Sequence, residues 1–288
     1  MASPFVQLNS GHSFPLIGFG TDKIYDQEAM NQAISAALKV GYRGFDTAKV
    51  YGNEGILSNA LKDLLPQFNL TRQDIYITTK VLPFTDESDI RKLIDESLDL
   101  FEYIDLMMVH YPKTNEYANE APENAEGREK TWKVLEDYCN QKKIRSIGVS
   151  NFEIKHLEEM KKYSNVMPAV NQVEFHPHFQ RKELHDYCNK EGVFFQAFSS
   201  LGRFNPVLLE DETVKQIATK HDVPVTSVLL AFALCQNVGI IPKSQNPDRI
   251  ASNLKAMEVK LDQKDLEDLK SLDINQNYIK RCTGWLVL

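Results

Sequence analysis

The sequence contains little cysteine and no excess of positive charge. Its 288 residues include four cysteines, and no two of them form a Cys-x-x-Cys pair, so neither a zinc site nor a redox motif is indicated. Scattered thiols are typical of a reducing compartment, and we therefore expect a cytoplasmic protein. The net charge of −7 argues against a nucleic-acid partner, because such proteins usually carry a basic stripe.

Long apolar runs and the common nucleotide motifs are also missing. No stretch approaches the ~18 apolar residues that cross a membrane, and the start, MASPFVQLNSGHSFP, lacks the basic and apolar regions of a signal peptide. The first predicted strand is followed by GFGTDK rather than Gly-x-Gly-x-x-Gly, and there is no Walker A motif. We expect no membrane partner, and because nothing demands an assembly we predict a monomer.

Short apolar segments alternate with longer helical patterns almost throughout the chain. Strands that alternate with helices form parallel sheets with right-handed crossovers, and barrels of this kind have about 250 residues. We therefore predict one domain over 1–288, of class α/β: a (β/α)8 TIM barrel preceded by a β-hairpin in FVQLN and HSFPL. The eight predicted strands are PLIGFG, GFDTA, IYITTKV, IDLMMVH, RSIGVS, PAVNQVEF, VFFQAF and VGIIPK.

Helical spacing and capping residues predict the segments between these strands. The long polar stretch 112–130 has no such pattern. It follows the strand IDLMMVH, so we expect a loop over the active-site face of the barrel. The predicted helices cover 26–40, 53–65, 87–100, 130–141, a segment after 151, 182–190, a region within 211–234, 247–254 and 263–272.

Four chemically active residues recur near the ends of three successive predicted strands. Asp46 lies in the second strand, and Tyr51 follows it. Lys80 comes 29 residues after Tyr51, and His110 comes 30 residues after Lys80, so each step is about one strand–helix–strand unit. In a parallel barrel these residues meet at one end. The set suits proton transfer to a carbonyl oxygen: Tyr51 as the acid, Lys80 lowering its pKa, Asp46 orienting Lys80, and His110 positioning the substrate.

Each member of this quartet also has an ordinary structural interpretation, since Asp–Lys pairs and histidines at strand ends often serve only the fold. Their joint placement favours catalysis. The quartet supplies a proton but no hydride, so a reduction requires a cofactor. The best phosphate site lies in IPKSQNPDRIASNL after the last strand, where Lys243, Ser244 and Arg249 could hold a monophosphate or could simply form a solvated loop.

Together these segments resemble the aldo-keto reductase family over essentially the whole chain. The resemblance is carried by GFDTAKVYGNE, ITTKV, MMVHYP, IGVSNF, PAVNQVEFHP, QAFSSLG and IPKS…RIASN, in that order. It implies NADPH as hydride donor, no metal, and the catalytic roles given above for the quartet. The cofactor residues that it implies are Gly20, Thr21, Asp46, Ser150, Asn151, Gln172, Phe198, Ser199, Leu201, Lys243, Ser244, Arg249 and Asn253.

The chain departs from mammalian aldose-reductase-like members at several positions. Phe198 replaces the tyrosine that stacks on the nicotinamide in that family, and Asp22, Leu82 and Tyr111 stand where tryptophan is common. Together with Trp285 in the tail, these three are the predicted substrate pocket, although Trp285 could equally pack on the surface. The pocket is therefore expected to be more polar than that of aldose reductase.

The sequence thus predicts NADPH-dependent reduction of aldehydes or ketones, with a small-molecule carbonyl compound as partner. Two other interpretations stay open. The barrel could be a nucleotide sensor or a structural protein with residual reductase activity. His176 and His178, two residues apart in HPH, could ligate a metal as in a hydrolase, but no convincing further ligands accompany them.

Overall fold

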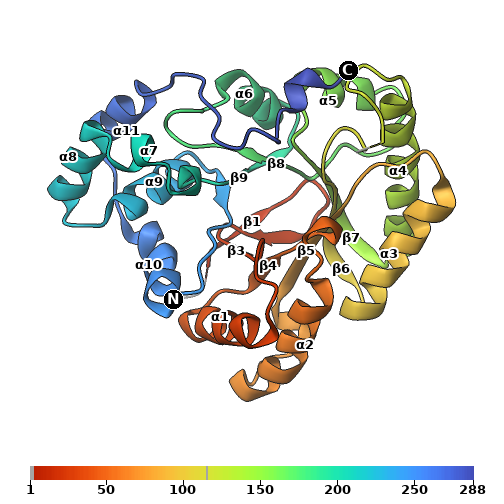
Figure 1. Ribbon diagram of the computed structural model, residues 1–288, viewed down its shortest axis with the longest axis horizontal. Coiled ribbons are helices and arrows are strands. Elements are labelled where there is room, and N and C mark those ends of the chain that lie inside the picture. The colour runs from red at the N-terminus through yellow and green to blue at the C-terminus, as the bar shows by residue number, and fades with distance from the viewer. Residues whose placement is uncertain (1–2, 115) are drawn as a thin grey trace.

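The computed structural model describes residues 3–114 and 116–288 and has a parallel eight-stranded sheet at its centre (Figure 1). Each strand pairs with the next one in the chain, and the sheet closes on itself. Gly18 N donates to Ile240 O at 2.8 Å and Ile240 N donates to Leu16 O at 2.9 Å, which joins the last strand to the first. The predicted (β/α)8 barrel is confirmed, with strands β3 (Phe19–Gly20), β4 (Gly44–Asp46), β5 (Tyr76–Val81), β6 (Ile104–Val109), β7 (Ile144–Ser150), β8 (Val170–Glu174), β9 (Phe194–Phe198) and β10 (Gly239–Ile240).

Helices surround the sheet on its outer face (Figure 1). Their ends follow local capping chemistry. The first helix, for example, begins after Asp26, whose side chain accepts from Ala29 N, and ends at Gly41, whose φ of 111° favours glycine. The helices are α1 (Gln27–Val40), α2 (Glu54–Leu64), α3 (Glu87–Phe101), α4 (Glu123–Asn140), α5 (Ile154–Met160), α6 (Lys182–Lys190), α7 (Pro206–Leu209), α8 (Glu212–His221), α9 (Val225–Leu234), α10 (Pro247–Lys255) and α11 (Gln263–Lys270).

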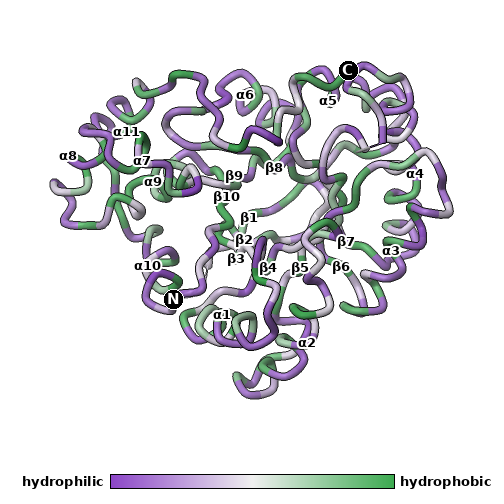
Figure 2. Tube along the Cα trace, in the orientation of Figure 1, coloured by the Kyte–Doolittle hydropathy of each residue, from purple (hydrophilic) through white to green (hydrophobic). Residues whose placement is uncertain are grey.

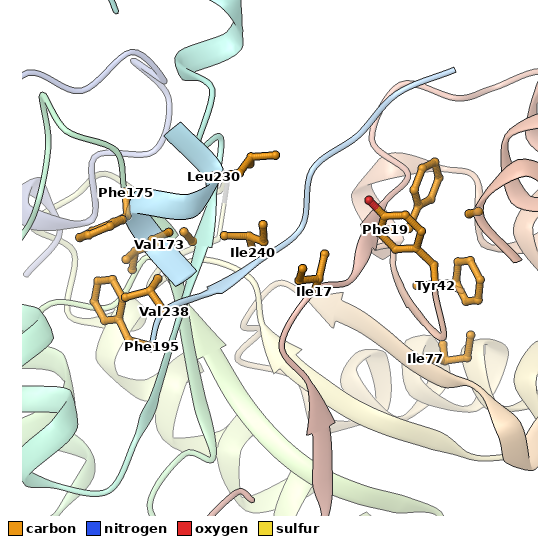
Figure 3. Close-up of a cluster of buried hydrophobic side chains, with 14 of the residues drawn as sticks. Ile17, Phe19, Tyr42, Ile77, Val173, Phe175, Phe195, Leu230, Val238 and Ile240 are labelled. Carbon is orange, nitrogen blue, oxygen red and sulfur yellow. The ribbon is translucent and has the colours of Figure 1, made fainter. Parts of the chain in front are cut away.

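The main core lies between the sheet and these helices. Apolar residues concentrate on the inner side of the helical layer, and polar residues face outward (Figure 2). Figure 3 shows part of this core, including Phe175 and Phe195. Phe175 stacks on Phe232 at 5.6 Å between ring centroids and meets Phe195 edge-on at 5.7 Å. Burial of such large side chains supplies the main driving force for closing the barrel.

A second, smaller core closes the amino-terminal end of the barrel. The predicted hairpin is present as β1 (Phe5–Gln7) and β2 (Ser13–Pro15), paired antiparallel. Phe14 of β2 packs against Tyr76 at 5.2 Å and Phe194 at 5.6 Å between ring centroids, and it joins Leu106 and Met108 in one buried cluster. Because this end is filled, the carboxyl ends of the strands form the open face.

One local prediction is corrected and another is refined. The region 112–130 is not one long loop, because α4 begins at Glu123, and its first turn carries Glu123 and Glu126, which favour a helix start. The helical region 211–234 is two helices, divided where Asp222 adopts a φ of 52° and Pro224 precedes α9. Among the residues described, no single helix has the length and apolar character to span a membrane; α8 and α9 pass that test only as a pair bent by 92°.

Candidate active site

Strand register directs the predicted catalytic residues into the barrel at its open end. Asp46, the last residue of β4, pairs with Thr78, and Lys80 lies two residues further along β5. Lys80 in turn pairs with Met108, and His110 lies two residues beyond that. Because side chains alternate between the two faces of a strand, residues two apart share a face. The three side chains therefore belong to one inward-facing row.

The structure brings all four members of the quartet into one contiguous group. Lys80 Nζ lies 2.6 Å from Asp46 Oδ1 and donates to Thr47 O at 3.0 Å, and both charged side chains are buried. The same Nζ is 5.1 Å from the centroid of the Tyr51 ring. Tyr51 meets His110 edge-on, with 5.6 Å between ring centroids. The carboxylate, the ammonium, the phenol and the imidazole are therefore spatial neighbours in that order.

Burial sets the protonation of this group. It raises the pKa of Tyr51 well above its ordinary value, and the negative charges of Asp46 and Asp22 add to the effect. The prediction that this pKa is lowered is therefore not confirmed, because burial of the phenol outweighs the nearby positive charge. Burial also lowers the pKa of Lys80, opposed by Asp46.

His110 is held as a neutral imidazole at ordinary pH. Burial lowers its pKa well below the ordinary value, and the charge of Lys80 acts in the same direction. Its Nδ1 is buried, and no hydrogen-bond partner reaches it from the described part of the chain. A neutral imidazole has one donor and one acceptor nitrogen, so His110 can either donate to or accept from a ligand in this site.

A row of amides adjoins the quartet. Gln172 donates through Nε2 to Asp46 Oδ2 at 2.9 Å and to Gln196 Oε1 at 2.8 Å. Asn151 donates through Nδ2 to His110 O at 3.0 Å and to Ser150 Oγ at 3.1 Å. Since both N–H groups of each amide are engaged, Gln172 and Asn151 have only their carbonyl oxygens left for a ligand.

The backbone is strained at two of the predicted cofactor residues. Asn151 has a φ of 62° and Ser199 has a φ of 51°, a backbone region that residues other than glycine seldom adopt. Such strain often accompanies ligand sites. Gly20 lies in a close approach of two strands, because a Cβ there would sit 2.8 Å from Ile241 O. Thr21 lies beside Asp46, its hydroxyl donating to Asp46 O at 2.8 Å.

The predicted phosphate residues surround the start of α10. Arg249 lies in its first turn and is exposed, with its guanidinium 6.0 Å from the centroid of the Phe204 ring in the loop after β9. Lys243 is exposed and Asn253 is buried. Ser244 Oγ accepts from Asn246 N at 3.1 Å, so its hydroxyl also stabilises the local turn. Phe198 ends β9 and Ser199 begins the loop after it; both are partly exposed, whereas Leu201 in that loop is buried.

The predicted substrate residues have different neighbours in the structure. Asp22 Oδ2 lies 3.9 Å from both Arg203 and Arg281, and Tyr111 OH accepts from Thr283 N at 3.1 Å. Leu82 follows β5 directly and is partly buried. Trp285 packs against Phe179 at 5.7 Å between ring centroids and lies under the guanidinium of Arg181 at 5.5 Å.

Sequence reasoning missed several residues around the site. Gln196 completes the amide row, and Arg203, Arg281 and Glu174 line or support the rim. Arg203 directly follows QAFSSLG but is not part of that motif, and Arg281 lies in a tail without a motif. No sequence signal therefore connected them with the site. Glu174 lies within PAVNQVEFHP and could have been noticed as a charged residue at the end of an apolar strand. No group of three or more metal-ligating side chains occurs in residues 3–114 and 116–288, and Glu174 Oε1 lies 3.0 Å from His176 Nε2.

Polar side chains converging at the carboxyl end of a closed eight-stranded parallel barrel are characteristic of the barrel enzymes. The sequence matches the model of the Aldo/keto reductase family over residues 16–274. The chain therefore belongs to the aldo/keto reductase family and is an oxidoreductase.

Individual relatives cover nearly the whole chain. It is 34% identical to a glyoxal reductase of Bacillus subtilis, over 93% of this chain and 92% of that protein. It is 33% identical to an NAD(P)H-dependent D-xylose reductase of Candida tropicalis, with coverages of 96% and 94%. Among solved structures, an aldo-keto reductase from a deep-sea metagenome library of the Medee basin superposes with a TM-score of 0.86 at 32% identity, covering 94% of this chain and 96% of that one. An aldo/keto reductase from Brucella melitensis gives a TM-score of 0.84 at 34% identity, with coverages of 94% and 100%.

Proposed function

We propose that the chain reduces aldehydes and ketones to alcohols, with NADPH as the hydride donor and Tyr51 as the proton donor. The observation that carries the proposal is the unbroken contact from Asp46 through Lys80 and Tyr51 to His110 at the open end of the barrel. Relatives whose names include glyoxal reductase and NAD(P)H-dependent D-xylose reductase support carbonyl reduction by a nicotinamide cofactor.

Tyr51 suits the role of general acid because it keeps its proton until negative charge develops on a nearby oxygen. Its raised pKa ensures that it is protonated at neutral pH. An oxygen that gains charge during reduction becomes a stronger base and can take this proton, and Lys80 then stabilises the phenolate left behind. Asp46 holds Lys80 in place, and His110 shares the hydrogen bond to the substrate oxygen.

The donor and acceptor groups of the site fit a nicotinamide dinucleotide. The free carbonyl oxygens of Gln172 and Asn151 suit the N–H2 of a carboxamide, which would be held beside the quartet. The partly exposed ring of Phe198 offers a stacking surface. When bound, the cofactor supplies the hydride that none of these side chains can provide.

The cations near α10 favour NADPH over NADH. Lys243 and Arg249 are exposed, and Ser244 and the first turn of α10 lie between them. A phosphate gains charge-assisted hydrogen bonds from such a set, whereas a free hydroxyl does not. Asn253 would contact the adenine, and Ser199 and Leu201 the pyrophosphate. A single-domain, monomeric, cytoplasmic enzyme remains the simplest expectation.

A substrate panel tests this function directly. Purified protein is assayed with aldehydes, ketones and sugars, each with NADPH and with NADH, by following cofactor absorbance. We expect turnover of generic aldehydes and a clear preference for NADPH. Tight NADPH binding without turnover of any carbonyl compound would instead support the nucleotide-sensing alternative, and hydrolysis that depends on added zinc would support the metal hydrolase.

A further inference from the structure

The segment that follows α11 crosses the open end of the barrel with few regular hydrogen bonds. In Figure 1 this last part of the chain runs from α11 past α6 to the end beside α5. Apart from one short 3-10 turn at Gly284–Leu286, it has no helix or strand of its own. A segment with so little backbone pairing has low local stability, so side chains of the barrel decide where it lies.

One buried carboxylate accepts hydrogen bonds from the middle of this segment. Glu174, the last residue of β8, accepts from Tyr278 N at 2.6 Å through Oε1 and from Ile279 N at 3.1 Å through Oε2. The surrounding contacts reinforce this junction. Tyr278 stacks on His176 with 5.0 Å between ring centroids, and its hydroxyl lies 2.8 Å from His178 Nδ1. Hydrogen bonds from two backbone N–H groups to one buried carboxylate are charge-assisted and strong.

The residues after this junction lie against the candidate active site. Arg281 approaches Asp22 at 3.9 Å, and Thr283 N donates to Tyr111 OH at 3.1 Å. Gly284 packs so closely against Asn151 that a Cβ on Gly284 would lie 2.0 Å from Asn151 O. The segment is therefore in contact with the same surfaces on which a carbonyl substrate would rest.

We propose that Glu174 is a positioning residue that fixes this C-terminal segment as a wall of the substrate pocket and thereby sets substrate affinity. The inference rests on the reductase function proposed above. Glu174 does not touch substrate; it acts through residues 278–285, which run from its two hydrogen bonds to the contact of Lys155 Nζ with Trp285 O at 3.1 Å. Loss of the carboxylate weakens binding of substrates large enough to reach this wall and spares the reaction of the smallest ones.

The test replaces Glu174 by glutamine, which keeps the volume but leaves one acceptor oxygen for two N–H groups. We expect Glu174→Gln to raise KM for an aromatic aldehyde about tenfold, the scale of one lost charge-assisted hydrogen bond. The kcat for a two-carbon aldehyde and the Kd for NADPH should change less than about twofold. Amide hydrogen exchange at 278–285 should accelerate, and quenching of the Trp285 fluorescence should rise.

The chain provides a matched control at another carboxylate. Glu136 in α4 accepts through Oε1 from two consecutive backbone N–H groups, Asn165 N at 2.7 Å and Val166 N at 3.0 Å, and is buried. These residues precede β8, so they lie at the opposite end of the barrel from Glu174. Glu136 Oε2 accepts from Asn165 Nδ2 at 2.7 Å, and Glu136→Gln removes that acceptor. The variant should lower the midpoint of thermal unfolding but leave KM and exchange at 278–285 unchanged.

If Glu174→Gln does not fold, Tyr278→Phe removes the contact to His178 and should move the same quantities in the same direction by a smaller amount. The proposal is overturned if the Glu174 variant behaves like the Glu136 variant, with lower stability but unchanged KM and unchanged exchange. If the unmodified protein reduces no carbonyl compound, the proposed function fails, yet the exchange measurement still decides whether Glu174 positions the segment.

Discussion

Two buried carboxylates with cationic partners lie at opposite ends of the same barrel. At the carboxyl end, Asp46 pairs with Lys80 at 2.6 Å. At the amino end, Asp105 of β6 pairs with Arg72 and Arg145, each at 2.8 Å, and accepts from Ile77 N at 2.9 Å. Both carboxylates are almost completely buried. From sequence alone, each pair has the same structural interpretation.

The difference lies in what surrounds each pair. Around Asp105 the partners form a closed set: Arg72 and Arg145 cover the Tyr103 ring, at 3.9 and 4.1 Å from its centroid. The Asp46 pair continues instead into a phenol and an imidazole, and the buried Nδ1 of that imidazole has no hydrogen-bond partner among the described residues. A network that ends in an unsatisfied group suits chemistry, whereas a fully satisfied network serves stability.

The largest expected effect is a loss of activity when the open end of the barrel is changed. Tyr51→Phe removes the proposed acid and should reduce kcat/KM by about 10²- to 10⁴-fold, the usual contribution of a general acid. NADPH affinity and thermal stability should be nearly unchanged, because the ring remains. Steady-state assays measure kcat/KM, and a cofactor fluorescence titration measures the affinity for NADPH. Near-normal turnover would remove Tyr51 from its proposed role.

The converse change at the amino end should act on stability alone. Asp105→Asn leaves two arginines with one neutral partner and should lower the free energy of unfolding by about 3 kcal/mol, since half-broken buried pairs are costly. The kcat of the folded variant should stay within about twofold of the parent. Urea unfolding and an assay at matched folded fraction give the two values; a large loss of kcat would mean that the ends are coupled.

Charge at the open end should also affect cofactor choice. Arg249→Gln removes one cation of the proposed phosphate site and should lower the ratio of kcat/KM for NADPH over NADH about tenfold, the worth of one charge-assisted hydrogen bond. Arg145→Gln, at the closed end, is the control and should leave the ratio unchanged. If both variants had the same ratio of kcat/KM for NADPH over NADH, the cofactor phosphate would have to bind elsewhere.

The smallest expected effect is a pH dependence that arises at the open end. Burial lowers the pKa of His156 to about 3, and its Nε2 lies 3.0 Å from Val287 O. The unfolded chain binds a proton below pH ~6.5 that the folded chain does not, so stability falls as pH falls from ~6.5 towards 3. At pH ~5.5 this histidine should cost about 1.4 kcal/mol. His156→Gln should flatten the slope of unfolding free energy against pH; an unchanged slope would mean that His156 is protonated in the folded protein.

Much of the fold was accessible from sequence because each element carries its own pattern. The strand order, the hairpin and α6 follow local periodicity and turn residues, and all are confirmed. The start of α4 was missed because the polar residues and Gly127 of its first turns resemble a loop, even though Glu123 and Glu126 favour a helix start. The quartet was found because parallel strands necessarily bring their ends together, whereas its roles in catalysis stay predictions.

Rim contacts could not be derived in the same way. Arg203 and Arg281 lie far apart in the chain and meet Asp22 only because two irregular segments pass the same point. The raised pKa of Tyr51 likewise depends on how deeply the phenol is buried and on which carboxylates surround it, neither of which is a property of spacing.

Local residue patterns are enough to predict the eight strand–helix units, the closed barrel and the four residues at its open end, because these depend on periodicities that repeat along the chain. Which buried ion pair adjoins unsatisfied groups, and where residues 271–288 lie, depends on the packed fold. Those outcomes depend on single contacts between distant segments, such as Glu174 with Tyr278, and no local pattern specifies such a contact.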